Sequence, residues 1–118
     1  MVKPENTGKR DLAYSQWHRT LPDHCYMIDI DSIEWRANGG VKALIETAKQ
    51  VALVYKKKFQ LKVLKELAQK IGAKAFLVLY SEELTCFEVY DLTTAEEWCD
   101  CQKQILNEQQ YRNFIINL

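Results

Sequence analysis

The sequence predicts an α/β fold in which a central mixed sheet is covered by helices on both faces, a three-layer α/β/α sandwich. Strand-like and helix-like segments alternate along the chain, and the nearly continuous apolar run at residues 74–80 is typical of a central strand. With 118 residues and 47% hydrophobic content, the chain is long enough for one ordinary core. We expect a flexible tail at residues 1–9 and a single domain at residues 10–118.

The first half of the chain predicts a helix followed by a hairpin. Aromatic and apolar residues recur with helical spacing over residues 10–21. Two-residue alternation over residues 26–35 predicts a long strand that bends near Asp31. The glycine-containing turn at residues 37–40 then leads into an apolar second strand at residues 41–47.

The second half predicts a helix, two strands and a last helix. An apolar stripe predicts a helix over residues 50–71, and Gly72 stands where helices commonly end. After the central strand, residues 85–92 alternate as a strand nearer an edge. Thr94 with Glu97 three residues later has the form of a capping box and predicts the start of the last helix. That helix is expected to carry Trp98, Ile105 and Leu106.

Composition excludes several classes of protein. The formal charge is zero, with 16 basic and 16 acidic side chains, so any binding to nucleic acid must depend on local clusters. No apolar stretch approaches the ~20 residues of a membrane span, and the N-terminus lacks a secretory signal. We therefore expect a cytoplasmic protein without a membrane partner. The cysteine spacing matches no zinc or disulfide framework, which favours reduced, structural thiols. The cysteines are Cys25, Cys86, Cys99 and Cys101.

Acidic residues on the expected hairpin are the most informative feature of the chain. Asp29 and Asp31 lie on its first strand and Glu46 on its second. A half-buried carboxylate is unfavourable unless a partner, a proton or a cation neutralises it. Lys49 is the cation that this pattern supplies, so a hydrated Mg²⁺, or Mn²⁺, is an economical explanation. The alternative is that the acids are merely solvated at a hairpin edge.

This hairpin, followed by a helix and another strand, resembles the PD-(D/E)XK nuclease superfamily. The resemblance covers residues 10–80 and is strongest over residues 29–49. It implies a restriction endonuclease-like fold and a metal-dependent endonuclease that hydrolyses DNA phosphodiester bonds by in-line attack of water. By this resemblance Asp31 and Glu46 bind the metal, and Lys49 orients the water.

The chain departs from the family pattern at the lysine, which the pattern puts two residues after Glu46. That position is Ala48, and Lys49 points to the opposite face in a regular strand. Three alternatives follow. A bulge brings Lys49 round, an inactivating substitution has put alanine in place of the lysine, or the site has degenerated.

The first acid of the pattern is also ambiguous. Asp31 ranks first because a short run through one turn joins it to Glu46, and Asp29 ranks second as a metal ligand on the same strand face. Asp23, which follows Pro22 and so matches the family's first two letters, ranks third. Gln60 is a further candidate, since some relatives place a glutamine on the following helix facing the site.

Basic residues predict a nucleic-acid surface around the acids. The candidates are Lys56, Lys57, Lys58, Arg19 and His18. We expect Tyr14 and Trp17 of the first helix to lie in the core. A homodimer would let two sites address two DNA strands, and the apolar residues 114–118 either seal such an interface or complete the core.

Two other functions compete with the nuclease. A catalytically degenerate relative would bind nucleic acid or a protein partner through the same sheet and would not cleave DNA even with lysine restored at position 48. A structural module with solvated acids would gain no stability from Mg²⁺.

Overall fold

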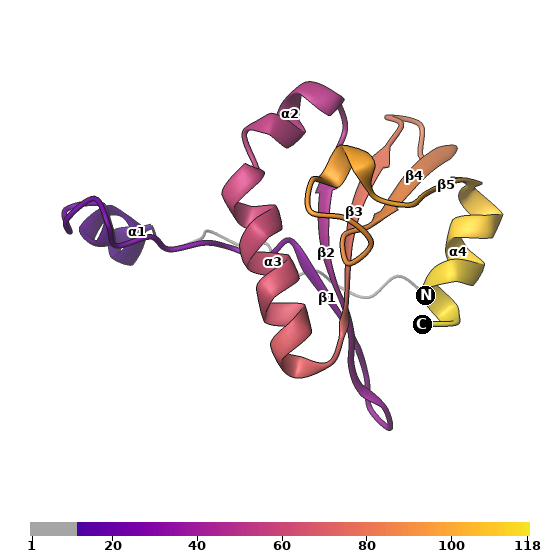
Figure 1. Ribbon diagram of the computed structural model, residues 1–118, viewed down its shortest axis with the longest axis horizontal. Coiled ribbons are helices and arrows are strands. Elements are labelled where there is room, and N and C mark those ends of the chain that lie inside the picture. The colour runs from indigo at the N-terminus through magenta and orange to yellow at the C-terminus, as the bar shows by residue number, and fades with distance from the viewer. Residues whose placement is uncertain (1–11) are drawn as a thin grey trace.

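The computed structural model describes residues 12–118, which form a five-stranded sheet in the order β1-β2-β3-β4-β5 (Figure 1). The strands are β1 (Ser32–Arg36), β2 (Gly40–Ala48), β3 (Lys74–Tyr80), β4 (Cys86–Asp91) and β5 (Lys103–Asn107). β2 and β3 are parallel, and the other neighbouring pairs are antiparallel. The prediction of an α/β fold with a mixed sheet is confirmed. The expected tail at residues 1–9 lies outside the described residues.

Helices connect and flank these strands. They are α1 (Ala13–His18), α2 (Val51–Tyr55), α3 (Lys58–Ile71), the short 3-10 helix η1 (Trp98–Asp100) and α4 (Glu108–Ile116). α3 supplies the crossover from β2 to β3, which parallel neighbours require because a tight turn cannot join them. As predicted, Gly72 ends α3, with a left-handed φ of 71° that glycine adopts without strain.

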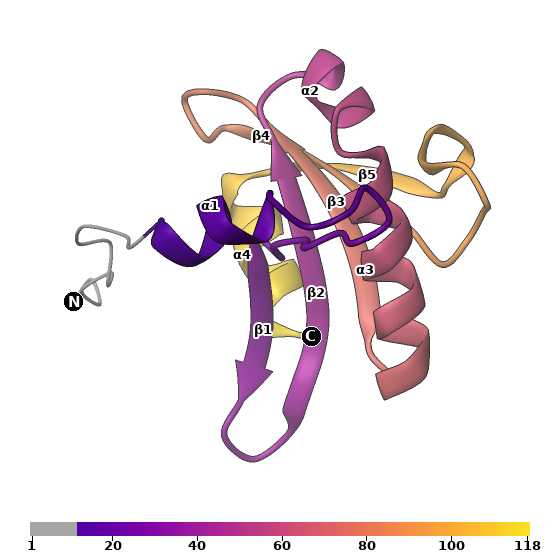
Figure 2. The ribbon, with the colours of Figure 1, turned by 90° about the vertical axis from the view of Figure 1, so that its left-hand side faces the viewer.

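Buried apolar side chains lie on both faces of the sheet. One cluster includes Leu44 and Leu77 together with Leu64 of α3. The other includes Ile45, with Phe114 of α4 packed against it. Since successive strand residues point to opposite faces, α3 and α4 lie against opposite faces of the sheet. They lie on the left and right of the sheet in Figure 1, and α4 lies behind the sheet in Figure 2.

The C-terminal apolar residues complete this core. Phe114, Ile115 and Leu118 pack against the cluster on the α4 face. Of the two alternatives for residues 114–118, core packing is therefore the one that the structure contains. Ile116 on the same helix is 65% exposed.

The expected strand at residues 26–35 is wrong in its first half, because β1 begins only at Ser32. Ser32 pairs with Ile45 as the first residue of the ladder. The Thr47 amide, which would continue the ladder, instead donates a hydrogen bond to Asp31 Oδ2 at 3.0 Å. A side-chain acceptor thus replaces the backbone carbonyl and ends the strand pairing.

The expected helix over residues 50–71 is divided into α2 and α3 at Lys56 and Lys57. The Lys57 amide donates to the Val54 carbonyl at 2.9 Å, a three-residue bond that tightens the end of α2. Lys57 then stands at the N-cap of α3. The apolar periodicity did not reveal this break, which redirects the Lys57 side chain toward the sheet.

The prediction that the last helix begins at Thr94 is wrong. Thr94 Oγ1 donates to the Asp91 carbonyl at 2.7 Å and accepts from the Gln102 amide at 2.8 Å, so it stabilises a turn after β4. Residues 103–107 form the edge strand β5. The last helix starts after Asn107, whose side chain and that of Gln110 form a complete capping box.

Candidate functional site

Asp31, Glu46 and Lys57 meet near the end of β2. Lys57 Nζ lies 3.1 Å from Glu46 Oε1 and 3.3 Å from Asp31 Oδ2. Asp31 directly precedes β1, Glu46 belongs to β2, and Lys57 lies between α2 and α3. Three segments therefore bring two carboxylates onto one amine. We refer to these residues as the Asp31–Glu46–Lys57 cluster.

Glu46 is the buried member of the cluster, with a side chain that is only 2% exposed. Leu44 and Ala48, two residues before and after it, belong to the apolar cluster under α3, so Glu46 faces the same side. Within the described residues, Glu46 Oε2 is buried without a hydrogen-bond partner. A buried carboxylate oxygen in this state favours a proton or a cation beside it.

Asp31 is more accessible, with a side chain that is 35% exposed. Its Oδ2 accepts hydrogen bonds from the Thr47 amide at 3.0 Å and the Thr47 hydroxyl at 3.2 Å, besides the contact with Lys57. These contacts orient the carboxylate from the neighbouring strand. Asp31 is therefore held at the solvent side of Glu46.

The two carboxyl groups differ in their affinity for protons. The pKa of Glu46 is raised to about 7, first by burial and then by its hydrogen bond with Asp31, against the lowering effect of Lys57. Burial also acts to raise the pKa of Asp31, but hydrogen bonds with Glu46, the Thr47 amide and Lys57 hold it below its usual value. Near neutral pH, Asp31 is therefore ionised, whereas Glu46 is present in both its protonated and its ionised form.

Lys57 remains an ammonium in this setting. Burial acts to lower its pKa, but hydrogen bonds and charge attraction from Glu46 and Asp31 outweigh it, and its pKa is raised. The amine therefore supplies one positive charge against two carboxyl groups. This corrects the interpretation that Lys49 is the cation near the acids.

The structure does not bring Lys49 to the carboxylates. Lys49 follows the end of β2 and is exposed, and the pairing of β2 with β3 is regular from Ala43 to Ala48. The bulge that would turn Lys49 toward the acids is therefore not present in that pairing. Ala48 itself is 5% exposed and packed in the core under α3, on the same face as Glu46.

Two further candidates lie near the cluster in the chain. Gln60 is half-buried in the first turn of α3 and makes no hydrogen bond to either carboxylate of the cluster. Asp29 is exposed and lies two residues before Asp31, outside β1. The hairpin strand that was expected to align Asp29 with Asp31 on one face is absent there.

The predicted basic surface is divided between two places. Lys56 and Lys58 are exposed at the junction of α2 and α3, beside Lys57 in the chain. His18 and Arg19 lie at the end of α1, which stands apart from the sheet (Figure 1). They are not brought to the cluster.

The expectation that Tyr14 and Trp17 lie in the core is wrong, since they are 64% and 54% exposed. Their rings contact each other with centroids 5.5 Å apart. Helical spacing predicts a core-facing stripe, whereas α1 buries none of its residues.

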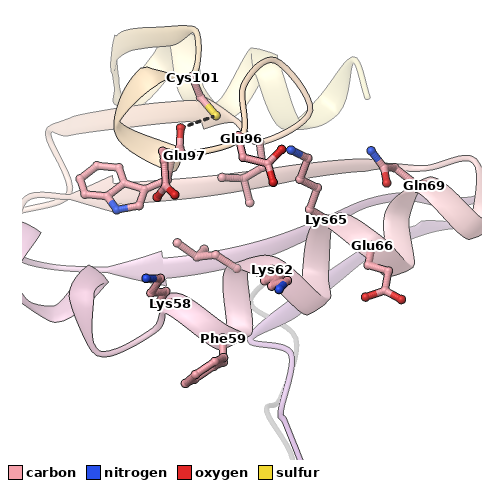
Figure 3. Close-up of a pocket in the computed structure, with 12 residues that line it drawn as sticks. Lys58, Phe59, Lys62, Lys65, Glu66, Gln69, Glu96, Glu97 and Cys101 are labelled. Carbon is pink, nitrogen blue, oxygen red and sulfur yellow. Dashed lines mark hydrogen bonds between the residues drawn. The ribbon is translucent and has the colours of Figure 1, made fainter.

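A cavity of about 570 Å³ lies between α3 and the segment that joins β4 to β5 (Figure 3). Lys58, Lys62 and Lys65 line it from α3, and Glu96 and Glu97 line it from the other side. Asp31 and Glu46 do not line this cavity, so it is separate from the cluster.

All four cysteines are free thiols, and they differ in burial. Cys101 is buried and its Sγ lies 3.5 Å from the Glu97 carbonyl, which it contacts as a weak donor. Cys99 and Cys86 are exposed. No disulfide constrains residues 12–118.

The donor set of the cluster is compatible with Mg²⁺ or Mn²⁺. Among residues 12–118, no group of three or more His, Cys, Asp and Glu side chains is arranged to hold a metal ion. Mg²⁺ is nevertheless often bound through one or two carboxylates and several waters. Asp31 and Glu46 offer two such hard ligands, and Glu46 Oε2 is an oxygen without a protein partner in the described part of the chain.

Comparison with protein-family models, with curated proteins and with solved structures finds no match to this chain. None of the helices formed by residues 12–118 combines the length and apolar character needed to cross a lipid bilayer.

Proposed function

We propose that this chain is a metal-dependent endonuclease of the PD-(D/E)XK type that hydrolyses DNA phosphodiester bonds, with a restriction endonuclease-like α/β/α fold. The arrangement of β1, β2, α3 and β3 supports this fold, because a hairpin is followed by a helical crossover to a parallel strand. Helices α3 and α4 on opposite faces of the sheet are compatible with three layers.

The single observation that carries the proposal is the convergence of Asp31 and Glu46 on one amine, within 3.3 and 3.1 Å of Lys57 Nζ. A metal can be shared only if the carboxylate of Glu46 on β2 and that of Asp31, directly before β1, lie close together. A lysine beside them is the third element of the motif. Here it comes from the α2–α3 junction.

The cluster residues have distinct roles in this proposal. Asp31 and Glu46 would hold the divalent ion, which when bound supplies charge shielding for the scissile phosphate and makes water easier to deprotonate. The Lys57 ammonium stabilises the negative charge that develops on the phosphate during in-line attack. Thr47 orients Asp31 through its amide and hydroxyl.

Lys57 compensates for alanine at the motif position. Ala48 faces the same side as Glu46, so a lysine there would direct its amine toward the region that Lys57 Nζ occupies. The break between α2 and α3 places the Lys57 amine on the face of the sheet that α3 covers. An active site is therefore compatible with Ala48.

The experiment is a nicking assay on plasmid and branched DNA with Mg²⁺ or Mn²⁺. Wild type should nick DNA, and Glu46→Gln and Lys57→Met should each lower the rate by about 100-fold. Glu88→Gln and Lys103→Met are matched controls, because this ion pair on β4 and β5 is separate from the cluster. Metal-dependent nicking that is indifferent to Glu46→Gln would overturn the proposal.

A lysine exchange tests the role of Lys57 directly. Ala48→Lys in a Lys57→Met background should restore part of the nicking rate, whereas Lys49→Met should leave it unchanged. Restoration would show that the amine is needed near the carboxylates, whichever element supplies it. A loss of activity in Lys49→Met equal to that in Lys57→Met would contradict the assignment.

The second candidate is a degenerate module that binds nucleic acid or a protein partner without cleavage. Ala48 at the lysine position favours it, as does the ion pairing of Lys57 with both carboxyl groups, which a divalent ion would have to compete with. It predicts DNA binding without nicking in wild type and in Ala48→Lys alike. Nicking by wild type would exclude it.

A further inference from the structure

Two exposed aromatic side chains, one from the segment before Asp31 and one from α3, stack on each other. The ring centroids of Tyr26 and Phe59 lie 5.9 Å apart, and the ring planes are inclined by 25°. Tyr26 is 72% exposed and Phe59 is 62% exposed. Tyr26 belongs to the segment that leads to Asp31, and Phe59 follows Lys57 by two residues in α3. The pair therefore presents aromatic surface to solvent, and its two residues lie close in the chain to Asp31 and Lys57.

The charges around this pair favour a polyanion. Lys58 and Lys62 are exposed, four residues apart on α3, and therefore on one side of the helix. In Figure 3, Lys58 and Lys62 lie between the Phe59 ring and the acidic residues Glu96 and Glu97, and the ring points away from those acids. A nucleic-acid backbone that passes Phe59 would therefore contact Lys58 and Lys62 before it came near the two glutamates.

We propose that the Tyr26–Phe59 pair stacks against an unpaired base of a DNA strand while Lys58 and Lys62 contact flanking phosphates, so that the preferred DNA contains a single-stranded stretch. This inference rests on the proposed function, because the cluster supplies the hydrolysis. Bases inside a duplex are covered on both faces by their neighbours, so a surface ring can stack only on an unpaired or terminal base. Lysines on the same helix add affinity that does not depend on base sequence.

The test measures binding separately from cleavage. Fluorescence anisotropy in EDTA measures the binding of a labelled oligothymidylate and its displacement by a relaxed, covalently closed circular duplex, which has neither ends nor loops. Phe59→Leu should weaken binding of the single strand by about 5-fold to 150-fold, the range for one base–aromatic stack. Its effect on the closed duplex should stay within about twofold.

Tyr14→Leu is the matched control, since Tyr14 is 64% exposed and contacts Trp17 in a second aromatic pair on α1. It should leave both affinities unchanged. Phe59→Trp keeps a ring and offers a larger stacking surface, so it should bind the single strand at least as tightly as wild type. This variant also guards against misfolding of Phe59→Leu.

Equal weakening of single-strand and duplex binding by Phe59→Leu, or no weakening of either, would overturn the inference. Lys62→Ala should reduce the slope of log K against log salt by about 0.7 for the single strand. The two proposals fail in different ways. Selective single-strand binding without metal-dependent nicking would refute the hydrolysis and retain the stacking site, whereas nicking without such selectivity would do the reverse.

Discussion

Replacing Glu46 by glutamine should change how the stability of the protein depends on pH. Glutamine has the size of the protonated glutamic acid and does not titrate, so the two proteins should be similarly stable below about pH 4.5. The raised pKa of Glu46, about 7 against an ordinary 4.5, means that the folded state binds this proton more tightly than the unfolded state. Wild type should therefore lose stability as the pH rises from 4.5 through 7, and Glu46→Gln should not.

The magnitude follows from the difference between the two pKa values. Each unit corresponds to ~1.4 kcal/mol, so the ionisation of Glu46 lowers the free energy of unfolding by about 3 kcal/mol at pH 8. With a urea m-value of about 1.5 kcal/mol/M, the unfolding midpoints of the two proteins should differ by about 2 M at that pH. The assay is urea unfolding followed by circular dichroism from pH 4 to pH 9.

Mg²⁺ should reduce this difference. Above pH 7 the ionised Glu46 is the form that a divalent ion requires, so added Mg²⁺ should stabilise wild type and leave Glu46→Gln unchanged. Glu88→Gln serves as the control, because Glu88 is partly exposed and paired with Lys103 on the outer strands. Parallel pH profiles for wild type and Glu46→Gln would refute the assignment of the buried proton to Glu46.

Further predictions concern the lysines and two helix ends. Lys57→Met should lower the free energy of unfolding at pH 8 by about 1–3 kcal/mol because it leaves the buried Glu46 charge without its counterion, whereas the exposed Lys49→Met should change it by less than ~0.5 kcal/mol in the same urea assay. Gly72→Ala should lower the free energy of unfolding by about 1–2 kcal/mol, since alanine is strained at a φ of 71°. Thermal unfolding measures this, and an unchanged midpoint would contradict it. Asn107→Ala should lower the free energy of unfolding by about 1 kcal/mol because it removes the capping box, whereas Asn107→Asp should keep most of this stabilisation. Equal unfolding midpoints for Asn107→Ala and wild type would argue against the cap.

Local sequence signals located much of the sheet. The apolar run at residues 74–80 predicted β3, whose middle residues are buried. The turn with glycine predicted the hairpin between β1 and β2, and Gly40 adopts the expected positive φ of 73°. Gly72 predicted the end of α3. These features depend on residues close together in the chain, so periodicity and turn chemistry were sufficient.

Where distant partners decide the structure, the local pattern predicts the wrong element. Thr94 and Glu97 have the spacing of a capping box, but Thr94 binds Asp91 and Gln102 across a turn. Residues 103–107 form an edge strand because they pair with the backbone of β4. The choice between helix and strand there was decided by a neighbour that the local pattern does not contain.

The sequence alone determined that Glu46 lies on a buried apolar strand and that an acid precedes it across one tight turn, because alternation and turn residues are local properties. Which amine meets the two carboxylates depends instead on how the elements pack together. Lys57 reaches them because the helix after β2 breaks and folds back over the sheet, so that residues 11 and 26 positions away in the chain come within hydrogen-bonding distance. A contact of that kind depends on the path of the backbone between elements, which neither spacing nor composition encodes.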